Sequence, residues 1–263
     1  MSTAFVNGYT PTPAPVPAES ELYGPDPYDI NFAFPLHEES LQTPRLKLVP
    51  FVPREHAAAY WDAIKDHPEL FQYYPFRHDL PQFLTFLDQR IRSVPGHTLF
   101  AVLDRTRADT SSSGTDTQGP LAGVIGLVNT SLENFSTELA YVVVFPASQH
   151  THVAKEMVGV LLRYLLNLPS ANPPGLGMRR VQWSAHPANR ASIGLAERMG
   201  FRKEGTLRNK WVLPDSLGHM GKKREAADDP AGGRAGRDSV LLSVCWDDWE
   251  GGVRERVESV LDK

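Results

Sequence analysis

The sequence has little cysteine, no long apolar run and no excess of basic charge. Its one cysteine among 263 residues, Cys245, excludes an internal disulfide and a zinc site built on several thiolates. No apolar stretch approaches the ~20 residues of a membrane-spanning helix, and no basic start followed by an apolar stretch predicts a secretory signal. The formal net charge of −4 argues against a general nucleic-acid binder. We therefore expect a cytoplasmic protein without a membrane or nucleic-acid partner.

The first 40 residues differ from the rest in proline and in charge. They hold seven prolines and six acidic residues, and no Lys or Arg precedes Arg45. A proline-rich segment of one charge sign cannot form a strand ladder or bury much apolar surface. We interpret residues 1–40 as an acidic extension that is disordered or lies on the surface of a domain at 41–263. Four aromatic residues leave open that its second half packs on that domain: Tyr23, Tyr28, Phe32 and Phe34.

Hydrophobic periodicity divides the domain into an α/β pattern. Apolar runs and alternation predict strands at 45–51, 99–103, 121–128, 137–145, 180–185, 201–212 and 239–246. Helical periodicity predicts helices at 55–65, 82–92, 153–166 and 189–199, followed by a final helix that Asp247 or Asp248 caps. Two segments rich in glycine, serine or mixed charge, 104–119 and 214–238, are expected to be long loops. The order predicts hairpins followed by a crossover helix into a parallel strand.

The junction after the strand at 137–145 is the first candidate site. Pro146 ends the strand, and a polar loop leads into the apolar helix at 153–166. The start of such a helix offers unpaired N–H groups and the positive end of the helix dipole, which suit a phosphate or pyrophosphate. We expect the N–H groups of residues 149–154 to be donors, together with the Thr151 hydroxyl. An ordinary strand-to-helix turn is the alternative.

The second candidate site is the start of the helix at 189–199. Asn189 and Ser192 are three residues apart and therefore neighbours on one face of the helix. A polar pair at the start of an apolar stripe points to a site at the carboxyl ends of the strands. The alternatives are that Asn189 caps the helix and that Ser192 is a small packing residue.

Together these segments resemble the GNAT N-acetyltransferase superfamily, in its RimJ/RimL-like branch. The resemblance covers about residues 41–262. It rests on the order and spacing of several short motifs: Leu41-Gln42-Thr43-Pro44-Arg45-Leu46, Glu138-Leu139-Ala140-Tyr141, Gln149-His150-Thr151-His152-Val153-Ala154-Lys155-Glu156, Asn189-Arg190-Ala191-Ser192, Ala196-Glu197-Arg198-Met199-Gly200-Phe201 and Trp246-Asp247-Asp248-Trp249.

The resemblance implies a fold and an activity. The fold is a mixed, mostly antiparallel sheet with a V-shaped splay between the fourth and fifth strands and helices on both faces. The activity is transfer of an acetyl group from acetyl-CoA to a primary amine, either a small molecule or a protein N-terminus, without a metal. The implied catalytic residues are Glu138, as a base, and Ser192, near the sulfur. The implied acetyl-CoA contacts are Val142, Val144, Gln149, His150, Thr151, His152, Val153, Ala154, Asn189 and Ser192.

Two features separate this chain from the usual family pattern. The loop at 149–154 lacks the family's two glycines, and His150 stands where an arginine is frequent. A non-catalytic acyl-CoA-binding module on the same fold therefore stays open as a second function, and an acyl group other than acetyl as a third. His150 and His152 do not reach the three or four converging ligands that a metal requires. Aromatic residues in the first helices and near Trp211 either line an acceptor pocket or fill the core.

Overall fold

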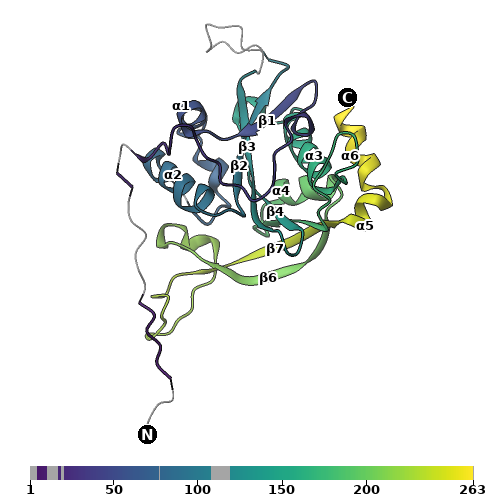
Figure 1. The fold of residues 1–263 in the computed structure, drawn as a ribbon. Helices are drawn as coiled ribbons and strands as arrows, with labels where there is room; N and C mark the ends of the chain where they lie inside the picture. The colour runs from purple at the N-terminus through teal and green to yellow at the C-terminus, as the bar shows by residue number, and fades with distance from the viewer. Residues whose placement is uncertain (1–4, 11–16, 19–20, 77, 108–118, 263) are drawn as a thin grey trace.

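The computed structural model describes residues 5–10, 17–18, 21–76, 78–107 and 119–262 and contains a seven-stranded sheet in the order β1-β2-β3-β4-β5-β7-β6 (Figure 1). All neighbouring strands are antiparallel except β4 and β5. The strands are β1 (Leu46–Pro50), β2 (Thr98–Asp104), β3 (Leu121–Ser131), β4 (Ser136–Val144), β5 (Arg180–Ala185), β6 (Arg202–Val212) and β7 (Gly236–Cys245). The helices are α1 (Pro53–Ile64), α2 (Leu80–Phe86), α3 (Val153–Leu166), α4 (Arg190–Arg198), α5 (Trp246–Asp248) and α6 (Arg254–Leu261). Segments of 3₁₀ helix are η2 (Glu38–Leu41), η3 (Pro68–Phe71), η5 (Pro146–Ser148) and η6 (Asp215–Met220), and segments of π-helix are η4 (Leu87–Arg92) and η7 (Trp249–Val253).

Helices cover both faces of the sheet, as predicted (Figure 1). Strand β2 shows why, because every one of its residues is buried. Its Leu99 and Ala101 pack with α1 and α2, whereas Phe100 and Val102 belong to the core beneath α3 and α6. Successive side chains of a strand point to opposite faces, so a strand buried throughout needs a layer on each side. Among the described residues, every helix is too short or too polar to cross a lipid bilayer.

The splay between the fourth and fifth strands is confirmed. The parallel ladder of β4 and β5 runs only from Ser136–Arg180 to Leu139–Trp183. Beyond it, the pairing of β4 with β3 shifts register, and Tyr141 adopts a left-handed backbone with φ of +53°. A bulge of this kind bends its strand and increases the local twist. The last part of β4 therefore diverges from β5 and leaves a gap in the sheet.

A buried ion pair attaches the start of the domain to α3. Glu156 is fully buried and pairs with Arg45, while the Thr43 hydroxyl donates to its other carboxylate oxygen at 3.3 Å. The Thr43 oxygen also accepts the N–H of Leu46 at 3.0 Å. Because an unpaired buried carboxylate is strongly destabilising, these partners fix β1 against the helix. The Thr-Pro-Arg-Leu segment therefore has a structural role, which is to attach β1 to α3.

A second ion pair holds the closed end of the splay. Both terminal nitrogens of Arg180 donate to the Glu204 carboxylate, at 2.7 and 2.5 Å, and the Ser243 hydroxyl donates to the same group at 2.7 Å. These residues belong to β5, β6 and β7 respectively. The hydrogen bonds from Arg180 are the largest cause that lowers the pKa of Glu204 from 4.5 to about 2.

The second half of the extension packs on the domain, which is the alternative that its aromatic residues left open: Leu22 and Tyr23 pack on one core cluster, and Phe32, Ala33, Leu36 and the buried Phe34 pack on the other. Two expectations about the later segments need correction. The segment at 214–238 is only partly a loop, because η6 and a small apolar cluster of Leu213, Leu217 and Ala235 order it and β7 already begins at Gly236. The final helix is interrupted at Gly252, whose φ is +118°. Most of the predicted loop at 104–119 lies outside the described residues.

The Arg180–Glu204 pair predicts how stability depends on pH. Because folding lowers the pKa of Glu204 to about 2, its contribution is complete above about pH 4.5 and is lost as the pH falls toward 2. We expect wild type to be more stable than Glu204→Gln at pH 7, with a difference that narrows below pH 4.5. Urea unfolding followed by tryptophan fluorescence measures this. The exposed control Glu255→Gln should show no narrowing, and a constant difference for Glu204→Gln would contradict the assignment.

Candidate functional site

A cleft of about 900 Å³ occupies the gap between β4 and β5. Its walls come from the second half of β4, the first turn of α3, the end of β5, α4, the strands β6 and β7, and the segment at 70–76. The two segments that the sequence analysis singled out, at 145–156 and 189–199, therefore meet at one cavity. The carboxyl ends of diverging parallel strands are where α/β sheets commonly bind ligands.

The inner edge of β4 presents peptide groups to this cleft. The Phe145 N–H donates to the Ala122 carbonyl beside it in β3 at 2.9 Å, so the alternation of the strand turns the backbone groups of Val142 and Val144 toward the gap. The Val142 carbonyl accepts the Tyr74 hydroxyl at 3.1 Å, and the Val144 carbonyl accepts the Gln149 side-chain amide at 3.3 Å. The two N–H groups have no strand beside them, because the β4–β5 ladder ends at Leu139. The backbone of Val142 and Val144 therefore faces the cleft.

The loop before α3 uses several of the donors predicted for a phosphate. The Gln149 N–H donates to the Pro146 carbonyl at 3.3 Å. The Thr151 hydroxyl donates to the Ser148 carbonyl at 2.6 Å and accepts the Val153 N–H at 3.3 Å. These contacts tie the Thr151 hydroxyl to the loop itself.

The remaining residues of the loop divide between the cleft and the interior. Gln149, His150, Thr151 and Ala154 line the cleft. His152 instead lies against buried Asp104, with 3.5 Å between its Nε2 and a carboxylate oxygen, and the Val153 side chain is fully buried. The amides of His150, Thr151, His152 and Ala154 stay candidate phosphate donors. Lys155 and Arg198 add positive charge to the wall that α3 and α4 form.

Glu138 lies in the ladder part of β4 and lines the cleft as a residue that is only 7% exposed. Its Oε2 accepts the side-chain amides of Asn129 and Gln182, each at 3.3 Å, and its Oε1 lies 3.9 Å from the Lys210 ammonium. Gln182 stands directly opposite it in β5. The carboxylate is thus held in place and is able to accept a proton from a group bound in the cleft.

Asn189 has the capping role that the sequence left open, Ser192 takes part in two hydrogen bonds, and both residues line the cleft. Asn189 is the residue before α4, and its side-chain oxygen accepts the Ser192 N–H at 3.1 Å. The Ser192 hydroxyl oxygen accepts the indole N–H of buried Trp183 at 2.9 Å. This bond leaves the hydroxyl hydrogen of Ser192 for another acceptor.

The aromatic residues of the first helices both line pockets and fill the core. Tyr73, Tyr74, Phe76 and Trp211 contact the main cleft. Tyr74 and Phe76 also border an apolar chamber of about 130 Å³ on the α1 and α2 side of the sheet, together with Trp61 and Phe71. Several polar residues of the site have no local sequence pattern that marks them: Asn129, His186, Lys210 and Arg237 line the cleft, and Gln182 donates to Glu138.

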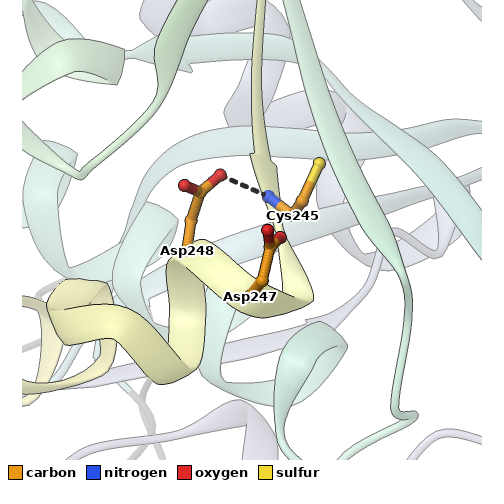
Figure 2. A group of neighbouring side chains, drawn as sticks. All are labelled: Cys245, Asp247 and Asp248. Carbon is orange, nitrogen blue, oxygen red and sulfur yellow. Dashed lines mark hydrogen bonds between the residues drawn. The ribbon is translucent and has the colours of Figure 1, made fainter.

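One group of potential metal ligands stands at the start of α5. Figure 2 shows Cys245, Asp247 and Asp248 together, with the Asp248 carboxylate accepting the Cys245 N–H at 3.1 Å. The other oxygen of Asp248 lies 2.8 Å from Arg202. Cys245 precedes the helix and Asp248 is its third residue, so the expected cap by Asp247 or Asp248 is corrected to a reciprocal cap between these two residues. We assign the group to helix capping.

Comparisons with known proteins give one family. The family model described as an acetyltransferase (GNAT) domain matches residues 45–202. No curated protein matches the chain.

Solved structures are similar in fold. A GCN5-related N-acetyltransferase from Brucella melitensis aligns with a TM-score of 0.63 and 21% identity over 84% of each chain. The Mycobacterium smegmatis RimJ in complex with CoA-disulfide aligns at 0.56 and 17%, covering 81% of this chain and 88% of that one. A Vibrio cholerae spermidine N-acetyltransferase in complex with CoA and spermine aligns at 0.52 and 15%, over 78% and 98%. At these identities the likeness shows the fold alone.

The cap at Asn189 predicts a measurable loss of stability. We expect Asn189→Ala to lower the free energy of unfolding by about 1 kcal/mol, since the Ser192 N–H loses its acceptor, and Asn189→Ser to recover most of it. Urea unfolding of both variants measures the effect. Equal losses for the alanine and serine variants would show that the side chain does not act as a cap.

Proposed function

The chain belongs to the GNAT acetyltransferase family, whose members use acetyl-CoA. On this premise we propose that it transfers an acetyl group from acetyl-CoA to a primary amine. We also propose that it is a member of the RimJ/RimL-like branch of the family. The observation that carries the proposal is the cleft where β4 and β5 part, with peptide N–H groups on one wall and a buried carboxylate at its base. Acetyl transfer requires a site where a thioester and an amine are held in contact, and the gap between the two strands can provide it.

We assign the acyl donor to the wall formed by β4, α3 and α4. The N–H groups of Val142 and Val144 suit the carbonyls of an extended ligand that joins the sheet edge. The first turn of α3 suits the diphosphate, because helix N-termini bind anions and Lys155 lies in that turn. Asn189 contacts the same wall and suits an amide of the pantetheine arm.

The reaction is direct attack of a neutral amine on the thioester carbonyl carbon. The N–C bond forms as the C–S bond breaks, and CoA leaves as a thiolate that takes a proton from water. We assign the Val142 N–H to the carbonyl oxygen as it gains charge and the Ser192 hydroxyl to the thiolate. Glu138 receives the proton that the amine releases. Much of the rate comes from holding the two reactants in contact.

The acceptor decides how much the base matters. An α-amine with a pKa near 7.7–8.0 is roughly 10% neutral at pH 7, whereas a lysine-type amine near 10.4 is far below 1% neutral. A peptide N-terminus therefore reacts with modest help, and an aliphatic amine depends strongly on Glu138. The proposal includes both kinds of acceptor, the peptide N-terminus and the aliphatic amine.

Two measurements test the proposal as a whole. Titration calorimetry should show acetyl-CoA binding to the full chain, and incubation with a panel of peptides and small amines should give a product heavier by one acetyl group in mass detection. Binding without any acetylated product would overturn the transferase proposal and support an acyl-CoA-binding module. Absence of binding would overturn both.

Glu138→Gln tests the assigned base. This nearly isosteric change keeps the contacts of Asn129 and Gln182 available but removes the proton acceptor. We expect kcat to fall about 10²–10⁴-fold while the affinity for acetyl-CoA stays unchanged in calorimetry. Glu133→Gln, an exposed acid in the turn before β4, is the matched control and should keep full activity. An unchanged kcat in Glu138→Gln would remove Glu138 from the mechanism.

A further inference from the structure

The cleft contains a buried arginine without a carboxylate partner among the described residues. Arg237 of β7 is 5% exposed. Its guanidinium donates to the Ser239 hydroxyl at 3.0 Å and to the Tyr73 carbonyl at 3.1 Å, both of them neutral acceptors. Its Nε–H is buried and has no acceptor in the part of the chain that the structure describes.

Such an arrangement is costly for a folded protein. A buried charge loses its hydration, and proteins normally compensate with an opposite charge. Burial lowers the pKa of Arg237, which is the direction expected when hydration is lost. Because Arg237 also lines the cleft, an anionic group of a bound ligand can provide the missing charge.

The charges around Arg237 favour an anion over a cation. Lys210 lines the same cleft, with its ammonium 3.0 Å from the Ser184 hydroxyl and 3.9 Å from Glu138. Glu138 is the one acidic residue among the described residues that line the cleft. A carboxylate would relieve the excess of positive charge here, whereas a polyamine would increase it.

Arg237 and Glu138 also lie on the same face of the sheet. In β7, Val240 and Leu242 point to the core beneath α3, so Arg237 and Ser239 point to the opposite face. In β4, Leu139 points to the same α3 core, and Glu138 therefore faces as Arg237 does. Both residues line the same cavity.

We propose that Arg237 anchors a carboxylate of the acceptor, so that the substrate is a primary amine that also carries a carboxylate. This inference rests on the proposed function and names its substrate class. A guanidinium recognises a carboxylate through its N–H groups, and Arg237 lines the cleft without a carboxylate partner among the described residues. The carboxylate belongs either to a free amino acid or to an acidic residue at a peptide N-terminus, since both offer the same chemistry.

The test compares acceptors that differ only in charge. Amino acids are measured against their carboxamides, and short peptides that begin with Glu against peptides that begin with Gln, with acetyl-CoA as donor. We expect wild type to prefer the carboxylate of one of these sets at least about tenfold in kcat/KM. The set that shows the preference identifies the source of the carboxylate.

Variants separate binding from structure. We expect Arg237→Gln to abolish the preference mainly through a higher KM for the carboxylate acceptor, with kcat/KM for the carboxamide within about twofold of wild type, and Arg237→Lys to retain part of it. Arg208→Gln, an exposed arginine of β6, is the control and should keep the preference. Unchanged acetyl-CoA affinity in calorimetry verifies that each variant is folded.

The outcomes distinguish this inference from the proposed function. If no amine of the panel is acetylated, the proposed function is overturned. Acetylation without a preference for carboxylates, or with polyamines as the best acceptors, overturns the anchor alone. Equal losses for charged and neutral acceptors in Arg237→Gln would assign the arginine to structure. If that variant does not fold, the carboxylate preference of wild type still decides the inference.

Discussion

The organisation of this protein depends on the point at which two parallel strands stop hydrogen-bonding to each other. Beyond Leu139 and Trp183 the inner edges of β4 and β5 separate, and peptide groups in the middle of a sheet lack a neighbouring strand. The bulge at Tyr141 bends β4 away, while the Arg180–Glu204 pair ties β5 to β6 on the other side. The cleft therefore results from the geometry of the strands, and the β4–β5 ladder fixes where the residues that line the cleft lie.

The cleft has two chemically different sides, and each matches one reactant of the proposed transfer. On the side of α3 and α4, helix N–H groups and two cations suit the phosphates of CoA. On the opposite face of the sheet lie Glu138, Lys210 and Arg237. Here one carboxylate stands among cations, which combines a proton acceptor with a place for an anion. The acetyl group would pass between these sides at the gap itself.

Much of the fold can be predicted from the sequence, but the site only in part. A largely apolar run defines the helix at 153–166 and alternation defines the strand at 180–185, both to the residue, because burial leaves little choice of residue type at the inward positions. The start of β7 was missed because glycine and charge precede it, and burial of Arg237 has no local signature. The hydrogen bonds of the Thr151 hydroxyl likewise depend on a turn whose geometry periodicity does not encode. Pairs such as Glu138 and Lys210 lie 72 positions apart, so only the strand register reveals them.

The carbonyls of Val142 and Val144 already accept hydrogen bonds from Tyr74 and Gln149. The open edge of β4 therefore offers donors while its acceptors are occupied. A strand from another molecule would find only half of the hydrogen bonds that a ladder requires, and association through such an edge is the usual route to β-aggregation. The inner edge of β4 therefore favours ligands that bring carbonyl oxygens of their own.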